Sequence, residues 1–171
     1  MIMKNKAFTL IELLVAMSVF VLIVASSSGL LVSGLRIQRR SVAYQQLLDQ
    51  TSYLAEYMSR AIRMAKKDIS GVCTGTAKLN YSFTGQCLKF VNYQGQCQQF
   101  CLEGNRLKDG NGVYLTSGGL SVSAFSVVFS GETQSDDIQP KVGLSLSIQG
   151  KENSTINIQT TISQRNLDVR K

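Results

Sequence analysis

A single carboxylate, Glu12, lies in the long uncharged stretch from Phe8 to Leu35, and two lysines, Lys4 and Lys6, come just before that stretch. A charged side chain at bilayer depth is costly, so a lone acid in an apolar segment of membrane-spanning length marks a functional site by default. The chemistry open to such a group is electrostatic, because it can neutralise a cation at the membrane edge. Glu12 is therefore the first candidate functional residue.

Cysteines are the second group that could do chemistry, and all four follow the apolar stretch: Cys73, Cys87, Cys97 and Cys101. An even number outside the cytoplasm favours disulfides over a metal site, and no CxxC pair gives zinc-ligand spacing. If residues 97–101 form a strand, Cys97 and Cys101 lie about 13 Å apart, beyond the limit of about 7 Å for a disulfide. Cys73 and Cys87 then pair with Cys97 and Cys101 in either combination. A tight loop would instead allow Cys97–Cys101 with Cys73–Cys87.

Catalytic and metal chemistry find little support in the chain. It contains no histidine, which removes Ser-His-Asp, Cys-His and HExxH mechanisms, and it has no phosphate-binding GxxxxGK[ST] or cofactor motif. The sequence Asp109-Gly110-Asn111-Gly112 resembles part of a calcium loop, and Glu132, Asp136 and Asp137 add carboxylates. A full EF-hand pattern is missing, and turn chemistry explains the loop as well. We expect no enzyme, no cofactor and no metal.

The formal charge of +7 raises the question of an anionic partner. Outside the N-terminal lysines, the excess lies mostly in residues 36–67 and lacks interleaved aromatic side chains. That pattern is typical of a solvated helix face rather than of a nucleic-acid site. Nucleic acid is therefore not an expected partner.

Two helical segments must position these groups. Phe8 to Leu35 exceeds the roughly 20 apolar residues that a membrane span requires. From Arg36 to Lys67 the pattern becomes amphipathic, with apolar or small residues at steps of three or four, and no Gly or Pro interrupts it. The sequence predicts one continuous helix from Thr9 to Lys67. Its core-facing residues are expected to be Ile37, Tyr44, Leu47, Leu48, Thr51, Leu54, Ala55, Met58, Ile62 and Ala65.

After Gly71 the composition shifts to short alternating runs separated by turn residues. Strands are predicted over residues 77–83, 86–93, 96–103, 120–129, 141–149 and 155–163, and residues 131–140 are predicted to form a loop. Hairpin turns are expected at Gln94-Gly95, Gly104-Asn105 and residues 150–153. An antiparallel sheet packed on the C-terminal half of the helix would bury both apolar faces, which is an α+β arrangement.

The stretch Lys4-Asn5-Lys6-Ala7-Phe8-Thr9-Leu10-Ile11-Glu12 resembles the processing signal of type IV pilins and pseudopilins, over roughly residues 4–35. Ala7 stands where the family usually has Gly, and Gly29 where many major pilins have a kinking Pro. The later helix is similar to that of the J/W-type minor subunits. The resemblance implies cleavage between Ala7 and Phe8, N-methylation of Phe8, and assembly through Glu12, which would neutralise the Phe8 ammonium of a neighbouring subunit.

The resemblance also implies partners and a location. The partners are a prepilin peptidase, other pilin or pseudopilin subunits, and an inner-membrane assembly platform driven by a cytoplasmic ATPase. The chain would cross the bacterial inner membrane once, with its C-terminal domain outside the cytoplasm, before it enters a filament. The expected organisation is a cleaved leader (1–7), a membrane and filament-core helix (8–35), its amphipathic continuation (36–70), and a disulfide-braced β-rich domain (71–171).

Two alternatives to a filament subunit remain open. One is a single-pass membrane anchor that carries an extracytoplasmic binding module. The other is an ordinary secretory signal peptide cut near Ala25–Ser28, although the apolar stretch is longer than the 7–15 residues typical of such a signal. The site of leader processing separates the three interpretations.

Overall fold

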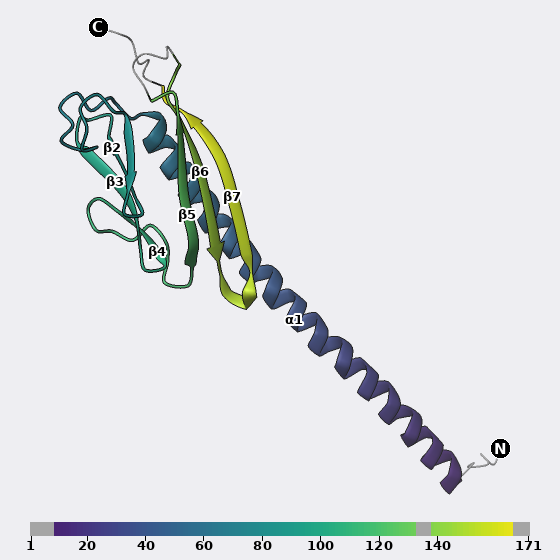
Figure 1. The fold of residues 1–171 in the computed structure, drawn as a ribbon. Coiled ribbons are helices and arrows are strands. Elements are labelled where there is room, and N and C mark those ends of the chain that lie inside the picture. The colour runs from purple at the N-terminus through teal and green to yellow at the C-terminus, as the bar shows by residue number, and fades with distance from the viewer. Residues whose placement is uncertain (1–8, 133–137, 166–171) are drawn as a thin grey trace. The chain divides into compact units, whose positions relative to one another are not determined.

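The computed structural model describes residues 9–132 and 138–165. The chain divides into two compact units, Met1–Ser41 and Val42–Lys171, and the first helix, α1 (Leu10–Arg63), contributes to both of them (Figure 1). The fold is α+β, with a long apolar N-terminal helix whose later part packs against antiparallel sheets. The predicted fold class is confirmed.

In the first unit, every described side chain of α1 is exposed. Leu10 is 78% exposed, Leu22 is 70% exposed and Leu30 is 75% exposed. The serines of this segment do not need a partner outside their own helix, since the hydroxyls of Ser18, Ser26, Ser27, Ser28 and Ser33 donate to carbonyls three or four residues earlier. The segment is therefore an apolar cylinder that only lipid or other apolar helices could cover.

In the second unit, α1 buries one stripe of side chains. The buried residues recur at steps of three or four and are Ala43, Leu47, Thr51, Leu54, Met58 and Ile62. Tyr44 and Leu48, both predicted for this face, are exposed instead, at 45% and 39%. Ile37, also predicted for it, lies in the first unit and is 70% exposed. Tyr44 and Leu48 each lie one position beyond a buried residue, about 100° further round the helix. Ala55, also predicted to be buried, is only half-buried.

The strands form two antiparallel sheets rather than the single sheet predicted. The first has the order β1-β2-β3-β4 and contains β1 (Tyr81–Thr84), β2 (Cys87–Val91), β3 (Cys97–Glu103) and β4 (Arg106–Asp109). The second has the order β5-β6-β7 and contains β5 (Ser121–Ser130), β6 (Lys141–Gln149) and β7 (Thr155–Ser163), with a short 3-10 turn, η1 (Lys151–Asn153), between β6 and β7.

The division into two sheets has a local cause at the free edge of β4. The chain folds back after β4, so that the Leu115 amide donates to the Leu107 carbonyl at 2.8 Å, and Lys108 forms an isolated bridge with Tyr114. Residues 114 and 115 therefore occupy the edge of β4, where β5 would have to pair if the two sheets were one. The predicted hairpins at Gln94-Gly95, Gly104-Asn105 and residues 150–153 are confirmed by the pairing of the flanking strands.

Two predicted boundaries are wrong, the end of the helix and the start of the first strand. The helix ends at Arg63, before the predicted Lys67, because the Lys66 amide donates to the Val91 carbonyl at 2.8 Å and the Asp68 amide donates to the Leu79 carbonyl at 2.9 Å. The first strand begins at Tyr81 instead of residue 77. Lys78 has a φ of 69°, which an extended strand does not permit.

Both sheets and the helix share one core in the second unit. Phe90 and Phe100 lie at its centre with ring centroids 5.6 Å apart. Tyr81 packs on Phe129 of the second sheet with ring centroids 6.0 Å apart, and its hydroxyl donates to the Ile62 carbonyl at 2.9 Å. Burial, with a smaller contribution from Glu132, raises the pKa of Tyr81, so this hydroxyl remains protonated and fixes β1 to the end of α1.

Candidate functional site

Glu12 lies in the first turn of α1 and interacts with Thr9, the residue before the helix. The Thr9 amide and the Thr9 hydroxyl each donate to Glu12 Oε2 at 3.3 Å, and the Glu12 amide donates to Thr9 Oγ1 at 3.4 Å. This reciprocal pattern is a capping box, in which Thr9 is the N-cap and Glu12 is the third helical residue. The carboxylate thus has a role within its own chain, where it satisfies helix donors that lack an intrahelical partner.

The capping box leaves one carboxylate oxygen available. Among the described residues, Glu12 Oε1 accepts no hydrogen bond. The positive end of the helix dipole favours an anion at this position. The arrangement can therefore hold a carboxylate at the helix N-terminus and still offer one oxygen to an outside cation. The sequence prediction missed Thr9, although the spacing Thr9-x-x-Glu12 is the capping-box signal.

Ala7 and Phe8, the residues of the predicted cleavage and methylation site, lie outside the described residues. Cleavage, methylation and the assembly role of Glu12 therefore remain predictions. In the described part of the chain, α1 is the single helix long and apolar enough to cross a membrane, and it lies near the N-terminus.

The four cysteines form two disulfides, Cys73–Cys97 and Cys87–Cys101. This is one of the two combinations that a regular strand over residues 97–101 predicts. Cys87 and Cys101 lie directly opposite each other in the register of β2 and β3, with Cα atoms 4.0 Å apart. The alternative pairing of Cys97 with Cys101 is wrong because both belong to β3, where a strand keeps them too far apart.

A buried carboxylate, Asp68, organises the loop that carries Cys73. Asp68 is 3% exposed. Its Oδ1 accepts from the Gly71 amide at 2.9 Å and from the Ser70 hydroxyl at 3.2 Å. Its Oδ2 accepts from the Cys73 and Thr74 amides, both at 2.8 Å, and from the Thr74 hydroxyl at 3.1 Å.

These hydrogen bonds hold Asp68 ionised. Burial alone would raise the pKa of the carboxyl, but the bonds from Thr74, Cys73 and Gly71 outweigh burial and lower the pKa to about 2, from the ordinary 3.8. A carboxylate that accepts several backbone N–H bonds behaves in this way. Sequence reasoning missed Asp68. Its position just before Ser70-Gly71 is a turn signal that could have identified it.

The suggested calcium loop is a turn held by its own aspartate. Asp109 Oδ1 accepts from the Asn111 amide at 3.0 Å and from the Val113 amide at 2.8 Å. Residues 136 and 137, which would add carboxylates, lie outside the described residues. Within the described part of the chain, no group of three or more His, Cys, Asp or Glu side chains could hold a metal ion.

Comparison with known proteins identifies the N-terminal segment. Residues 2–28 match the family model of the prokaryotic N-terminal methylation motif. No curated protein and no solved structure matches the chain. Type IV pilin-like proteins that carry the motif are processed by prepilin peptidase and are in general structural, and together with the apolar helix the motif indicates membrane anchoring. Similarity to the J/W-type minor subunits stays a prediction. The predicted resemblance to the prepilin processing signal is confirmed: the N-terminus of this chain carries the type IV prepilin signature.

Proposed function

We propose that this chain is a structural subunit, a minor pilin or pseudopilin, of a type IV pilus, a type II secretion pseudopilus or a related filament. The observation that carries the proposal is the methylation motif at residues 2–28, continuous with a helix whose apolar side chains are exposed on all sides in the first unit. Such a segment is soluble in lipid and equally able to pack among identical apolar helices. Both environments are needed by a subunit that moves from a membrane into a filament.

The proposed assembly step uses the capping box. Removal of residues 1–7 would create a new ammonium group on Phe8, and methylation would keep its positive charge. Glu12 is held by Thr9 at the helix N-terminus, with Oε1 available for the Phe8 ammonium of a neighbouring subunit. Because both groups would meet in a poorly solvated environment, their attraction exceeds that of a surface pair. Prepilin peptidase, other subunits and the assembly platform are the partners that this step requires.

Mass spectrometry of the mature N-terminus tests the processing step. We expect a protein that begins at Phe8 with a methylated amine. A protein that retains Met1 would overturn the proposal in favour of a membrane-anchored binding module. A start near Ser27 would indicate ordinary secretion.

Replacement of Glu12 by alanine tests the assembly step separately. We expect E12A to be cleaved at Ala7/Phe8 but to be recovered in sheared filaments at about one tenth of the wild-type level or less, since a lost ion pair in a poorly solvated site costs more than about 1.4 kcal/mol. Asp49→Asn is the matched control, because Asp49 is an exposed acid on the same helix. Incorporation of E12A into filaments at the wild-type level would refute the assembly role of Glu12.

A further inference from the structure

The loop that follows α1 displays two aliphatic side chains to solvent. Val72 is 87% exposed and Ile69 is 76% exposed, and they are the most exposed large apolar side chains among the described residues of the second unit. Tyr93, at 58% exposure, lies in the β2–β3 turn. The disulfide Cys73–Cys97 ties this turn to the loop, since Cys73 follows Val72 and Cys97 begins β3. Ile69, Val72 and Tyr93 together are called the apolar tip below.

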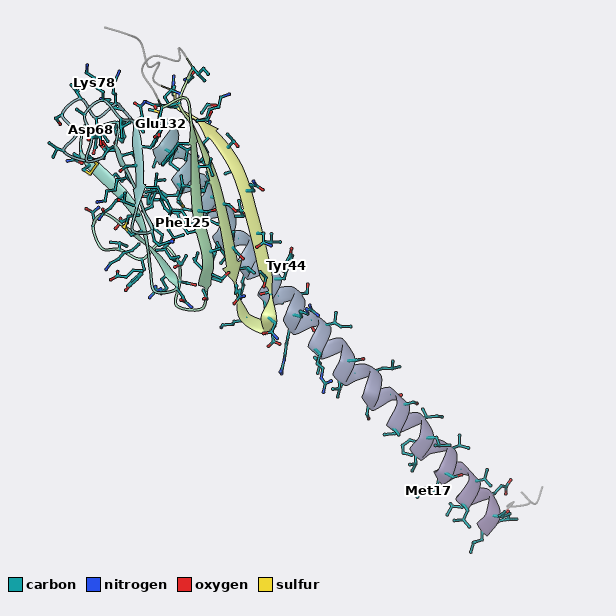
Figure 2. The ribbon with its side chains drawn as sticks, in the orientation of Figure 1. Met17, Tyr44, Asp68, Lys78, Phe125 and Glu132 are labelled. Carbon is teal, nitrogen blue, oxygen red and sulfur yellow. A yellow bond between two sulfur atoms is a disulfide. The ribbon has the colours of Figure 1, made fainter. Side chains whose placement is uncertain are left out.

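Several hydrogen bonds and one glycine fix the conformation of this loop, so the exposure of Ile69 and Val72 is a property of the fold. Asp68 fixes the loop from inside by accepting the amides of residues 71, 73 and 74. The Lys78 amide closes its far end on the Asp68 carbonyl at 2.7 Å, and Figure 2 shows Asp68 and Lys78 together at this end of the unit. Gly71 has a φ of 75°, and a Cβ there would lie 2.5 Å from the Ala77 nitrogen. Only glycine permits this path, which leaves Ile69 and Val72 outside.

The segment around the apolar tip is basic. Arg63, Lys66 and Lys89 carry its charge, and Arg63 and Lys66 are exposed, whereas Lys67 and Lys78 have interactions of their own. The acids are Asp68 and the half-buried Glu132, which Figure 2 shows at the same end of the unit. Asp68 is buried and directed into its own loop. The backbone places Lys66 beside β2, through the bridge with Val91, and Lys89 lies on that strand. A partner that fits this end of the domain is anionic and offers an apolar layer just below its charges.

We propose that the apolar tip, with its surrounding lysine and arginine side chains, docks on an anionic phospholipid surface. Ile69 and Val72 would enter the boundary between headgroups and acyl chains, and Tyr93 would lie at the headgroup level, where its ring and hydroxyl both find partners. The basic side chains would face the lipid phosphates. The two most exposed side chains of the apolar tip, Ile69 and Val72, are aliphatic and cannot stack on bases as Tyr93 can, which favours lipid over a nucleic acid as the occupant. The contact is independent of leader processing and of the α1 membrane segment.

Vesicle capture by the full chain tests the proposal. The protein is held in phosphatidylcholine nanodiscs, which occupy its apolar helix, and is mixed with vesicles that are later floated. We expect capture by vesicles of phosphatidylglycerol and phosphatidylcholine but not by vesicles of phosphatidylcholine alone. Raising the salt from about 0.1 M to about 1 M shortens the Debye length from about 10 Å to about 3 Å and should release the nanodiscs.

Variants separate the contribution of the apolar tip to vesicle capture from the contribution of the basic side chains. The double variant I69S/V72S should weaken capture about tenfold or more, and Lys66→Gln about fivefold. Val128→Ser is the matched control, because Val128 is 70% exposed on β5, outside the apolar tip. Unchanged capture of I69S/V72S would overturn the proposal, as would equal capture by neutral vesicles. Retention of a duplex oligonucleotide by wild type and I69S/V72S alike would point to a purely electrostatic nucleic-acid surface, and it too would overturn the proposal. Circular dichroism of each variant checks that the fold is intact.

Discussion

Replacement of Asp68 by asparagine should loosen the loop after α1 while keeping the size of the side chain. Three amides, the buried ones of Cys73 and Thr74 and the partly buried one of Gly71, donate to the two carboxylate oxygens at 2.8–2.9 Å. An asparagine has one acceptor oxygen, so at least one of the amides loses its partner. A buried donor left unsatisfied costs about 1–3 kcal/mol, and hydrogen bonds to a charged acceptor exceed neutral ones. We expect D68N to lower the free energy of unfolding of the second unit by about 2–4 kcal/mol.

The same carboxylate should make stability depend on acid pH. The folded pKa of Asp68, about 2, lies below the ordinary 3.8. The stabilisation is therefore fully present above about pH 4 and is lost as the pH falls through about 2, since the unfolded chain then binds the proton first. The lowered pKa of Asp68 corresponds to about 2 kcal/mol in the free energy of unfolding, present above about pH 4 and absent below about pH 2. D68N should not show this contribution, so the two proteins should approach each other in stability toward pH 2.

Guanidinium unfolding of the full chain in detergent, followed by near-ultraviolet circular dichroism of the tyrosines with disulfides intact, measures both effects. Asp49→Asn is the control, because Asp49 is exposed on α1 and a surface change should stay within about 0.5 kcal/mol. If D68N also stays within that range at pH 7, or keeps the wild-type profile between pH 4 and pH 2, the assigned role of Asp68 is refuted.

Three further predictions concern backbone and covalent features. Gly71→Ala should cost clearly more than Gly75→Ala in thermal unfolding, because both have positive φ but only at Gly71 would a Cβ lie 2.5 Å from a backbone nitrogen; equal losses would contradict this. The double replacement of Cys87 and Cys101 by serine should lower stability by about 3 kcal/mol, from the 14-residue separation of the pair, and an unchanged unfolding midpoint would argue against it. Thr9→Val should speed amide hydrogen exchange in the first turn of α1 through a loss of about 1 kcal/mol, whereas Thr9→Ser should not, and identical exchange in both would exclude the capping box.

The helical part of the fold could be predicted because its signals are local. An uninterrupted apolar stretch and a stripe at steps of three or four identify α1 and most of its buried face. The end of α1 could not be predicted locally. Lys66 and Lys67 suit a helix C-terminus, but the Lys66 amide is taken by Val91, a residue whose position depends on how the sheet packs.

Local sequence patterns also predict the sheets only in part. Alternation identifies β5, β6 and β7 because each keeps one apolar face. It cannot show that Leu115 returns to the edge of β4, and therefore it predicts one sheet where two exist. The candidate site divides in the same way: Glu12 could be found from its isolation in the sequence. For Asp68 the sequence offers only the turn signal at Ser70-Gly71, and the amides that bind its carboxylate become visible only when the loop is folded.

The two disulfides have a consequence for resistance to proteolysis. Their spans overlap, since Cys73–Cys97 encloses Cys87 and Cys87–Cys101 encloses Cys97. Every peptide bond from Cys73 to Cys101 is therefore bridged by at least one sulfur–sulfur link. A protease that cuts an exposed turn there, such as the one at Gln94-Gly95, leaves both fragments covalently joined and the strands β2 and β3 still paired. The second unit can thus tolerate one cut between Cys73 and Cys101 without losing a piece of the chain.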